Sequence, residues 1–90
     1  MSLSRVAKRR DANEPEIVAA LEGVGCKVVR SDVVDLIVGR GKRTWIMEVK
    51  TDRGQLTPAQ VRNFSDWPGQ YNVVRTPAEA LDIVGAGDER

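Results

Sequence analysis

Two apolar stretches on either side of a glycine-containing turn constrain this chain more than any other feature. They span residues 33–38 and 44–51, and the pair Gly41-Lys42 lies between them. A Gly-X pair is typical of two-residue hairpin turns. The pattern therefore predicts an antiparallel hairpin in which Arg40 lies opposite Arg43.

The register of this hairpin brings two carboxylates together. Counting outward from the turn pairs Val38 with Trp45, Ile37 with Ile46, and Asp35 with Glu48. Both acids have apolar neighbours, where a buried charge is costly unless something compensates it. Directly opposed residues have Cβ atoms about 5 Å apart, so the two charges would repel each other. A shared divalent cation converts that repulsion into a binding site.

Lys50 follows Glu48 by two positions, so strand alternation puts both on one face, with Met47 and Val49 on the other. An ammonium group there could orient or activate water, or stabilise charge that develops on a phosphate. The alternative is a plain salt bridge between Lys50 and the two acids. Asp35, in the predicted register, favours the metal site.

The composition excludes several kinds of chemistry. The chain has 90 residues, which is the length of a single domain. It has no histidine, which excludes His-based zinc sites and His-dependent nucleophile systems. It has one cysteine, which excludes an intramolecular disulfide. A metal ion would be held by oxygen ligands, which favour Mg²⁺, Mn²⁺ or Ca²⁺. Hydrophobic residues make up 41% and charged residues 30%, so we do not expect global disorder.

The remaining segments complete an α/β pattern. A helix is expected after Asn13, as its N-cap, with an apolar stripe that includes Ile17 and Leu21. Capping boxes that begin at Thr57 and Thr76 predict two more helices. The expected strands cover 26–30, 33–38, 44–51 and 71–75. The order is α-β-β-β-α-β-α, in a single domain over 13–85 between a flexible basic arm (1–12) and a frayed C-terminus (86–90).

The net charge is only +1, but basic residues are clustered. One cluster is the N-terminal arm with Arg9 and Arg10, and the other is the turn with Arg40, Lys42 and Arg43. These residues could make sequence-independent phosphate contacts. The alternative is a solvated tail and a solvated turn.

Asp35 followed by Glu48-Val49-Lys50 resembles the PD-(D/E)XK nuclease motif. The segment 51–60 resembles the VRR-NUC branch, in which Glu-x-Lys-Thr leads through a glycine-containing loop to a helix that carries Gln. Segments 10–18 and 71–76 resemble the first helix and last strand of small phage and bacterial members, so the likeness covers about residues 9–84. In the family, Gly-x-Pro-Asp usually precedes the first ligand, whereas this chain has Asp32-Val33-Val34-Asp35. Asp32 is therefore an alternative ligand.

The resemblance implies a restriction-endonuclease-like mixed β-sheet flanked by helices, with the first and middle helices packed against it. It implies a Mg²⁺ or Mn²⁺ site with Asp35, Glu48 and the Val49 carbonyl as ligands. Lys50 would be the catalytic lysine. Glu16 and Gln60 would act from the two helices, although the capping box is a complete structural explanation for Gln60.

These observations predict a cytoplasmic, phage or bacterial, metal-dependent endonuclease that cleaves DNA, without a membrane partner. One alternative is a nucleic-acid-binding module that does not cleave; another is an interaction protein whose acids only neutralise Lys50 and nearby arginines. A chain of this length buries little core. We therefore expect some of Trp45, Met47, Val49 and Trp67 to remain exposed on a monomer and to form a homodimer, which suits a branched substrate such as a four-way junction.

Overall fold

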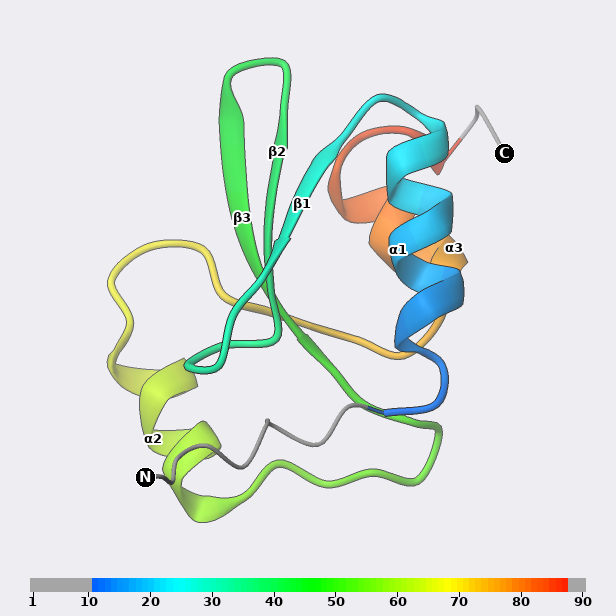
Figure 1. Cartoon of the computed structure of the whole chain (residues 1–90). Helices are drawn as coiled ribbons and strands as arrows, with labels where there is room; N and C mark the ends of the chain where they lie inside the picture. The colour runs from blue at the N-terminus through cyan, green and yellow to red at the C-terminus, as the bar shows by residue number, and fades with distance from the viewer. Residues whose placement is uncertain (1–10, 88–90) are drawn as a thin grey trace, which may run out of the picture.

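The computed structural model describes residues 11–87 and shows a mixed sheet of four strands with three helices (Figure 1). This confirms the predicted α/β class and element order. The elements are α1 (Glu14–Gly23), β1 (Lys27–Arg30), β2 (Leu36–Arg40), β3 (Arg43–Val49), α2 (Pro58–Asp66), β4 (Asn72–Val74) and α3 (Pro77–Ile83). No helix within residues 11–87 is long and apolar enough to cross a membrane.

The β2–β3 hairpin has the register that its turn chemistry predicts. The sheet order is β1-β2-β3-β4, with antiparallel pairing at the first two junctions and parallel pairing between β3 and β4. Arg40 lies opposite Arg43, and the ladder continues to Leu36 opposite Met47. Gly41 and Lys42 have φ of 57° and 67°. Two positive φ values match the right-handed twist of the strands on either side of the turn.

The chain enters β2 three residues later than predicted, because residues 31–35 form a bend instead of a strand. The Ser31 hydroxyl accepts a hydrogen bond from the Val33 backbone N–H at 3.1 Å. The Ser31 N–H donates to the Asp35 carbonyl at 3.1 Å. A serine hydroxyl that caps its own turn competes with strand pairing. Asp35 therefore lies at the end of a bend, immediately before the ladder.

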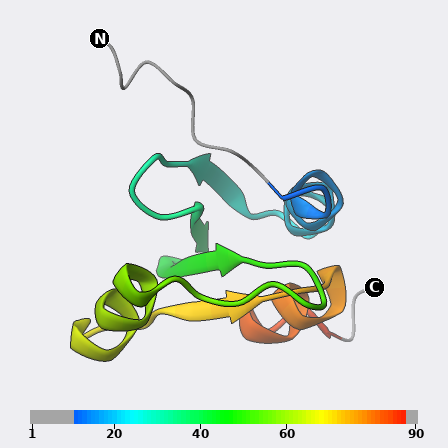
Figure 2. The same cartoon turned by 90° about the horizontal axis from the view of Figure 1, so that it is seen from below.

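One face of the sheet carries the core, and α1 and α3 cover it. Trp45, Met47 and Val49 of β3 are at most 2% exposed, so of the four residues of which some were expected to stay exposed on a monomer, only Trp67 is exposed, at 49%. Figures 1 and 2 show α1 and α3 together on one side of the molecule and α2 on the other. No residue of α2 is buried. The last helix, not the middle one, therefore completes the core with the first.

The folded part extends past the predicted boundary at residue 85. Ala86 is fully buried, and its N–H donates to the Leu81 carbonyl at 2.8 Å. The frayed end therefore cannot begin at 86. Most of the predicted basic arm, residues 1–10, lies outside the described residues.

Candidate active site

Asp35 and Glu48 are buried on the sheet face opposite the core, at 6% and 1% exposure. Because Leu36 pairs with Met47, Asp35 comes one position beyond the ladder, next to Glu48. The Val49 N–H donates to Asp35 Oδ2 at 2.8 Å and holds the carboxylate against β3. Asp32, the alternative ligand, is exposed. The burial therefore favours Asp35 over Asp32 as the first acid of the site.

Two neutral side chains donate hydrogen bonds to Glu48. Gln60 Nε2 donates to Oε2 at 2.9 Å, and the Tyr71 hydroxyl donates to Oε1 at 3.3 Å. Gln60 comes from α2 and Tyr71 from the residue before β4. Two segments that follow β3 in the chain thus fix the orientation of one carboxylate. The sequence did not indicate Tyr71, since its position depends on the parallel pairing of β3 with β4.

The surroundings of Tyr71 show that negative charge is concentrated here. Four causes together raise the pKa of Tyr71 from 10.0 to about 12: first the burial of the phenol, then the charge of Glu48, its hydrogen bond and the charge of Asp35. Both carboxylates therefore lie close enough to act on one hydroxyl. That hydroxyl stays protonated and remains a donor throughout the neutral pH range.

We expect the single tyrosine of the native protein to titrate near pH 12, and in the Glu48→Gln variant to titrate closer to 10.0. The substitution removes the repulsion and hydrogen bond due to Glu48, while burial remains. Since the unfolded phenol ionises first, the stabilisation linked to this proton is complete below pH 10 and is lost as the pH rises to about 12. Ultraviolet titration measures the phenolate, with urea-unfolded protein as the control. A native phenol that titrates near 10 would contradict this electrostatic description.

Lys50 follows Glu48 by two positions, directly after β3, and makes no ion pair with any residue within 11–87. Its side chain is half-buried. Its backbone is held on both sides, because its N–H donates to the Val74 carbonyl and its carbonyl accepts from Asn13 Nδ2, each at 3.0 Å. The plain salt bridge considered as an alternative for this lysine is therefore absent among the described residues. The ammonium remains available for a ligand.

Gln60 combines two roles that sequence reasoning treated as alternatives. Its backbone N–H donates to Thr57 Oγ1 at 3.1 Å, and its Oε1 accepts from the Thr57 N–H at 2.9 Å. This completes the predicted capping box. Because the oxygen of the amide caps the helix, its nitrogen points at Glu48. The capping geometry thus orients the amide that holds the carboxylate.

Gln60→Ala and Thr57→Ala should separate these two roles. Thr57→Ala removes the cap and should cost about 1 kcal/mol of unfolding free energy, with little effect on cleavage of a DNA substrate. Gln60→Ala also removes a hydrogen bond to a charged group, worth about 1.5–3 kcal/mol. It should slow cleavage about 10- to 100-fold, as for other residues that orient a metal ligand. Urea unfolding and initial cleavage rates measure the two effects. Equal rates for the two variants would restrict Gln60 to capping.

The helix α1 presents Glu14, and not the predicted Glu16, to the interior. Glu14 is 1% exposed and its Oε2 accepts from Arg30 Nε at 2.9 Å, whereas Glu16 is exposed. Glu14 continues the buried stripe of Ile17, Val18 and Leu21 one turn backwards. That spacing of three, four and seven residues could have identified it. Glu16 instead lines a shallow pocket with Thr51 and Arg75.

Asn13 and Arg75 fasten the segments around Lys50. Asn13 makes no side-chain cap; its Nδ2 instead donates to the carbonyls of Lys50 and Arg75, at 3.0 and 2.8 Å. Arg75 Nη1 donates to the carbonyls of Thr51 and Gly54, at 2.6 and 2.8 Å. The predicted N-cap thus clamps the ends of β3 and β4 together. The loop after Lys50 is held in place by an arginine.

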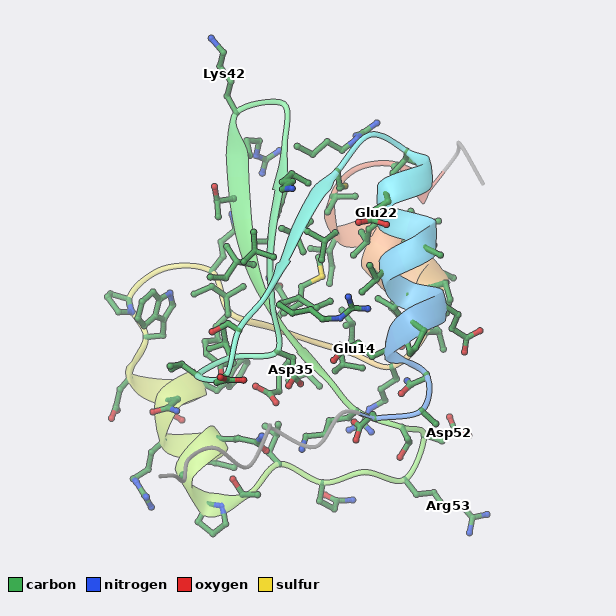
Figure 3. All side chains as sticks on the ribbon, in the orientation of Figure 1. Glu14, Glu22, Asp35, Lys42, Asp52 and Arg53 are labelled. Atoms are coloured by element: carbon green, nitrogen blue, oxygen red, sulfur yellow. The ribbon has the colours of Figure 1, made fainter. Side chains whose placement is uncertain are left out.

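The three predicted phosphate-binding residues that the structure describes, Arg40, Lys42 and Arg43, lie away from the carboxylates. Arg40 donates to the carbonyls of Val24 and Val84, at the C-terminal ends of α1 and α3, which gives it a structural role. Lys42 lies at the tip of the hairpin, at the opposite end from Asp35 (Figure 3). The Arg43 guanidinium lies 5.1 Å from the centre of the Trp45 ring. Arg9 and Arg10 lie outside the described residues.

The donor set fits a hard divalent cation with few protein ligands. Among residues 11–87, no three His, Cys, Asp or Glu side chains gather in a metal-binding group, so Asp35 and Glu48 would be the only carboxylates. Mg²⁺ is commonly held by one or two carboxylates together with waters and substrate phosphates. Two buried carboxylates whose charges act on one hydroxyl meet that requirement. The side chain of Val49 is buried in the core, so only its backbone could contribute.

No protein-family model, curated protein sequence or solved structure matches this chain.

Proposed function

We propose that the protein is a nuclease that hydrolyses phosphodiester bonds with a bound Mg²⁺ or Mn²⁺ ion. The observation that carries the proposal is the pair of buried carboxylates, Asp35 directly before β2 and Glu48 in β3. Lys50, two positions after Glu48, makes no ion pair in the described part of the chain. Like charges opposed in a sheet destabilise it, so a cation shared by the two acids would account for their placement. The likeness to PD-(D/E)XK nucleases supports the same assignment.

Each residue has a defined role in this proposal. Asp35 and Glu48 would hold the ion, and Val49 would fix Asp35 through its N–H while its carbonyl completes the protein ligands. The ion supplies Lewis-acid polarisation of the phosphate and lowers the pKa of water. Lys50 would donate hydrogen bonds to the attacking water and to the phosphate as negative charge develops there. Gln60 and Tyr71 would keep Glu48 in place.

The direct test is to incubate the full chain with end-labelled linear, flapped and four-way-junction DNA, with Mg²⁺, with Mn²⁺ or with a chelator. We expect cleavage that requires metal and is lost with the chelator. Calorimetric titration of Mn²⁺ in parallel measures the site without any substrate. A protein that neither binds Mn²⁺ nor cleaves any of these strands would contradict the proposal.

The second candidate is a module that binds nucleic acid without cleaving it. The exposed basic residues at the hairpin tip, Lys42 and Arg43, favour it. A pure binder, however, gains nothing from carboxylates buried near phosphates. Binding that persists in the chelator, with no cleavage in either metal, would assign this function instead.

The proposed homodimer retains only part of its basis. Of the four residues first assigned to its interface, Trp45, Met47 and Val49 are core residues, and only Trp67 is exposed, at 49%. The junction substrate depends on the dimer, since two symmetric sites suit two equivalent strands. Light scattering at micromolar concentration should give twice 9.9 kDa for the dimer. A mass near 9.9 kDa would exclude it, and equal cleavage of linear and junction DNA would exclude the junction preference.

A further inference from the structure

An apolar groove of about 360 Å³ opens beside the carboxylates, on the face of the sheet away from the core. Its floor includes Ile37 and Ile46, which lie opposite each other on β2 and β3. Val33 of the bend lines one side, and the rings of Trp67 and Tyr71 contribute on the other. This volume is within the range of small-ligand sites.

The groove is continuous with the candidate active site through Tyr71. The Tyr71 ring lines the groove, while its hydroxyl donates to Glu48 at 3.3 Å. The Phe64 ring packs edge-on against Tyr71, with 5.7 Å between the ring centres. Tyr71 therefore lies between a ligand in the groove and the Glu48 carboxylate.

One side of α2 and of the residue that follows it faces both the carboxylates and the groove. Gln60, which holds Glu48, and Asn63 and Trp67, which line the groove, follow at spacings of three and four residues, as on one helical face. The rise from Gln60 to Trp67 is about 10 Å, or roughly three steps of a stacked strand. A strand whose phosphate lies at the carboxylates would thus reach the groove within a few nucleotides.

The lining favours a base over a phosphate. Within the described residues, neither lysine nor arginine lines the groove, and the Asp66 carboxylate there would repel an anion. The amide of Asn63 supplies hydrogen-bonding groups near flat apolar surfaces. Every nucleobase has an apolar π-face and a polar edge, so aromatic side chains bind bases with little sequence preference.

Trp67 is placed to provide the stacking surface. Its side chain is 49% exposed although it lines the groove. A Cβ atom at Gly69 would lie 3.0 Å from Trp67 Nε1, so the indole lies close against Gly69 and would have to shift by a few tenths of an ångström to admit a side chain there. A close neighbour on one edge restricts the ring orientation while one face remains open to a ligand.

We propose that this groove binds an unpaired nucleobase of the strand that the active site cleaves. The inference rests on the proposed nuclease function and specifies its substrate as nucleic acid with unpaired nucleotides near the scissile phosphate. A base within a duplex is stacked on its neighbours and enters a protein site only after it leaves the stack. Single-stranded or locally opened substrates therefore have an unpaired base that can enter the groove, and an intact linear duplex does not.

The test measures binding of labelled single strands to proteins that carry Lys50→Ala, so that the strand stays intact, with Mg²⁺ present. Two single strands of equal length are compared: one carries all its bases, and the other has abasic sites through its centre. We expect the complete strand to bind about 5- to 100-fold more tightly. Trp67→Ala should remove this preference and Trp67→Phe should keep most of it. Val61→Ala, on the same helix and 46% exposed but not a lining residue, is the matched control.

The outcomes separate this inference from the function on which it rests. If the wild type cleaves DNA but the Lys50→Ala protein binds the complete and abasic strands equally, the groove assignment is wrong and the nuclease function stands. Absence of any binding, cleavage and Mn²⁺ uptake would overturn both. If Trp67→Ala changes the mass in light scattering from that of a dimer to that of a monomer, the groove belongs to a second copy, and the base-binding proposal is wrong. The abasic comparison needs no substitution at Trp67, so it stands even if that variant unfolds.

Discussion

Glu48→Gln is expected to abolish both Mn²⁺ binding and cleavage. The substitution removes one of two carboxylates from a site in which the described residues offer no third. It also places an NH₂ group where Gln60 Nε2 and the Tyr71 hydroxyl already donate. Loss of the ion removes several kcal/mol of transition-state stabilisation, which corresponds to a rate decrease of about 10³-fold or more.

Calorimetric titration and single-turnover cleavage measure the two losses, with circular dichroism to confirm the fold. Glu22→Gln is a matched control, because Glu22 is an exposed carboxylate on α1 (Figure 3). It should bind metal and cleave as the wild type does. Cleavage by Glu48→Gln at the wild-type rate in Mg²⁺ would refute the site.

Lys50→Ala is expected to retain metal binding and lose cleavage by about 10²- to 10³-fold. The ammonium makes no ion pair with the described residues, so its removal leaves the carboxylates and their hydrogen bonds in place. Its contribution is confined to the attacking water and to charge that develops on the phosphate.

The informative comparison is therefore between two readouts on one variant. Mn²⁺ affinity should stay within about threefold of wild type, since no ligand to a hard oxygen-bound ion is lost, while the single-turnover rate falls. Lys27→Ala, on the exposed first position of β1, controls for the loss of one positive charge. If Lys50→Ala reduced metal affinity and rate in parallel, the lysine would act by supporting the site and not in the reaction.

Local chemistry explains the parts of the site that could be predicted. The Gly41-Lys42 turn sets the hairpin register, and the register places Asp35 one position beyond the ladder, next to Glu48. The Thr57 capping box predicted the start of α2 at Pro58. Each of these rests on neighbours within a few residues, where side-chain and backbone preferences determine the geometry.

Longer-range contacts account for what was missed. Tyr71 reaches Glu48 only because β4 runs parallel to β3, and a parallel pairing leaves no turn to count from. Arg40 is predicted to contact phosphate, with a solvated turn as the alternative, yet α1 and α3 both end where its guanidinium donates to their carbonyls. Glu14 is a local exception, because it lies one helical turn before Ile17 on the buried stripe of α1 and, being charged, is not part of the apolar pattern.

The exposure of α2 has a dynamic consequence for the enzyme proposed here. A helix with no buried residue is held by few contacts, so its local opening should require much less free energy than unfolding of the core around α1 and α3. Gln60 leaves Glu48 whenever α2 opens, and Trp67 leaves the groove in the same event. The fraction of molecules competent to cleave would then follow the opening equilibrium of one short helix, and a strand that bridges Glu48 and Trp67 would close it.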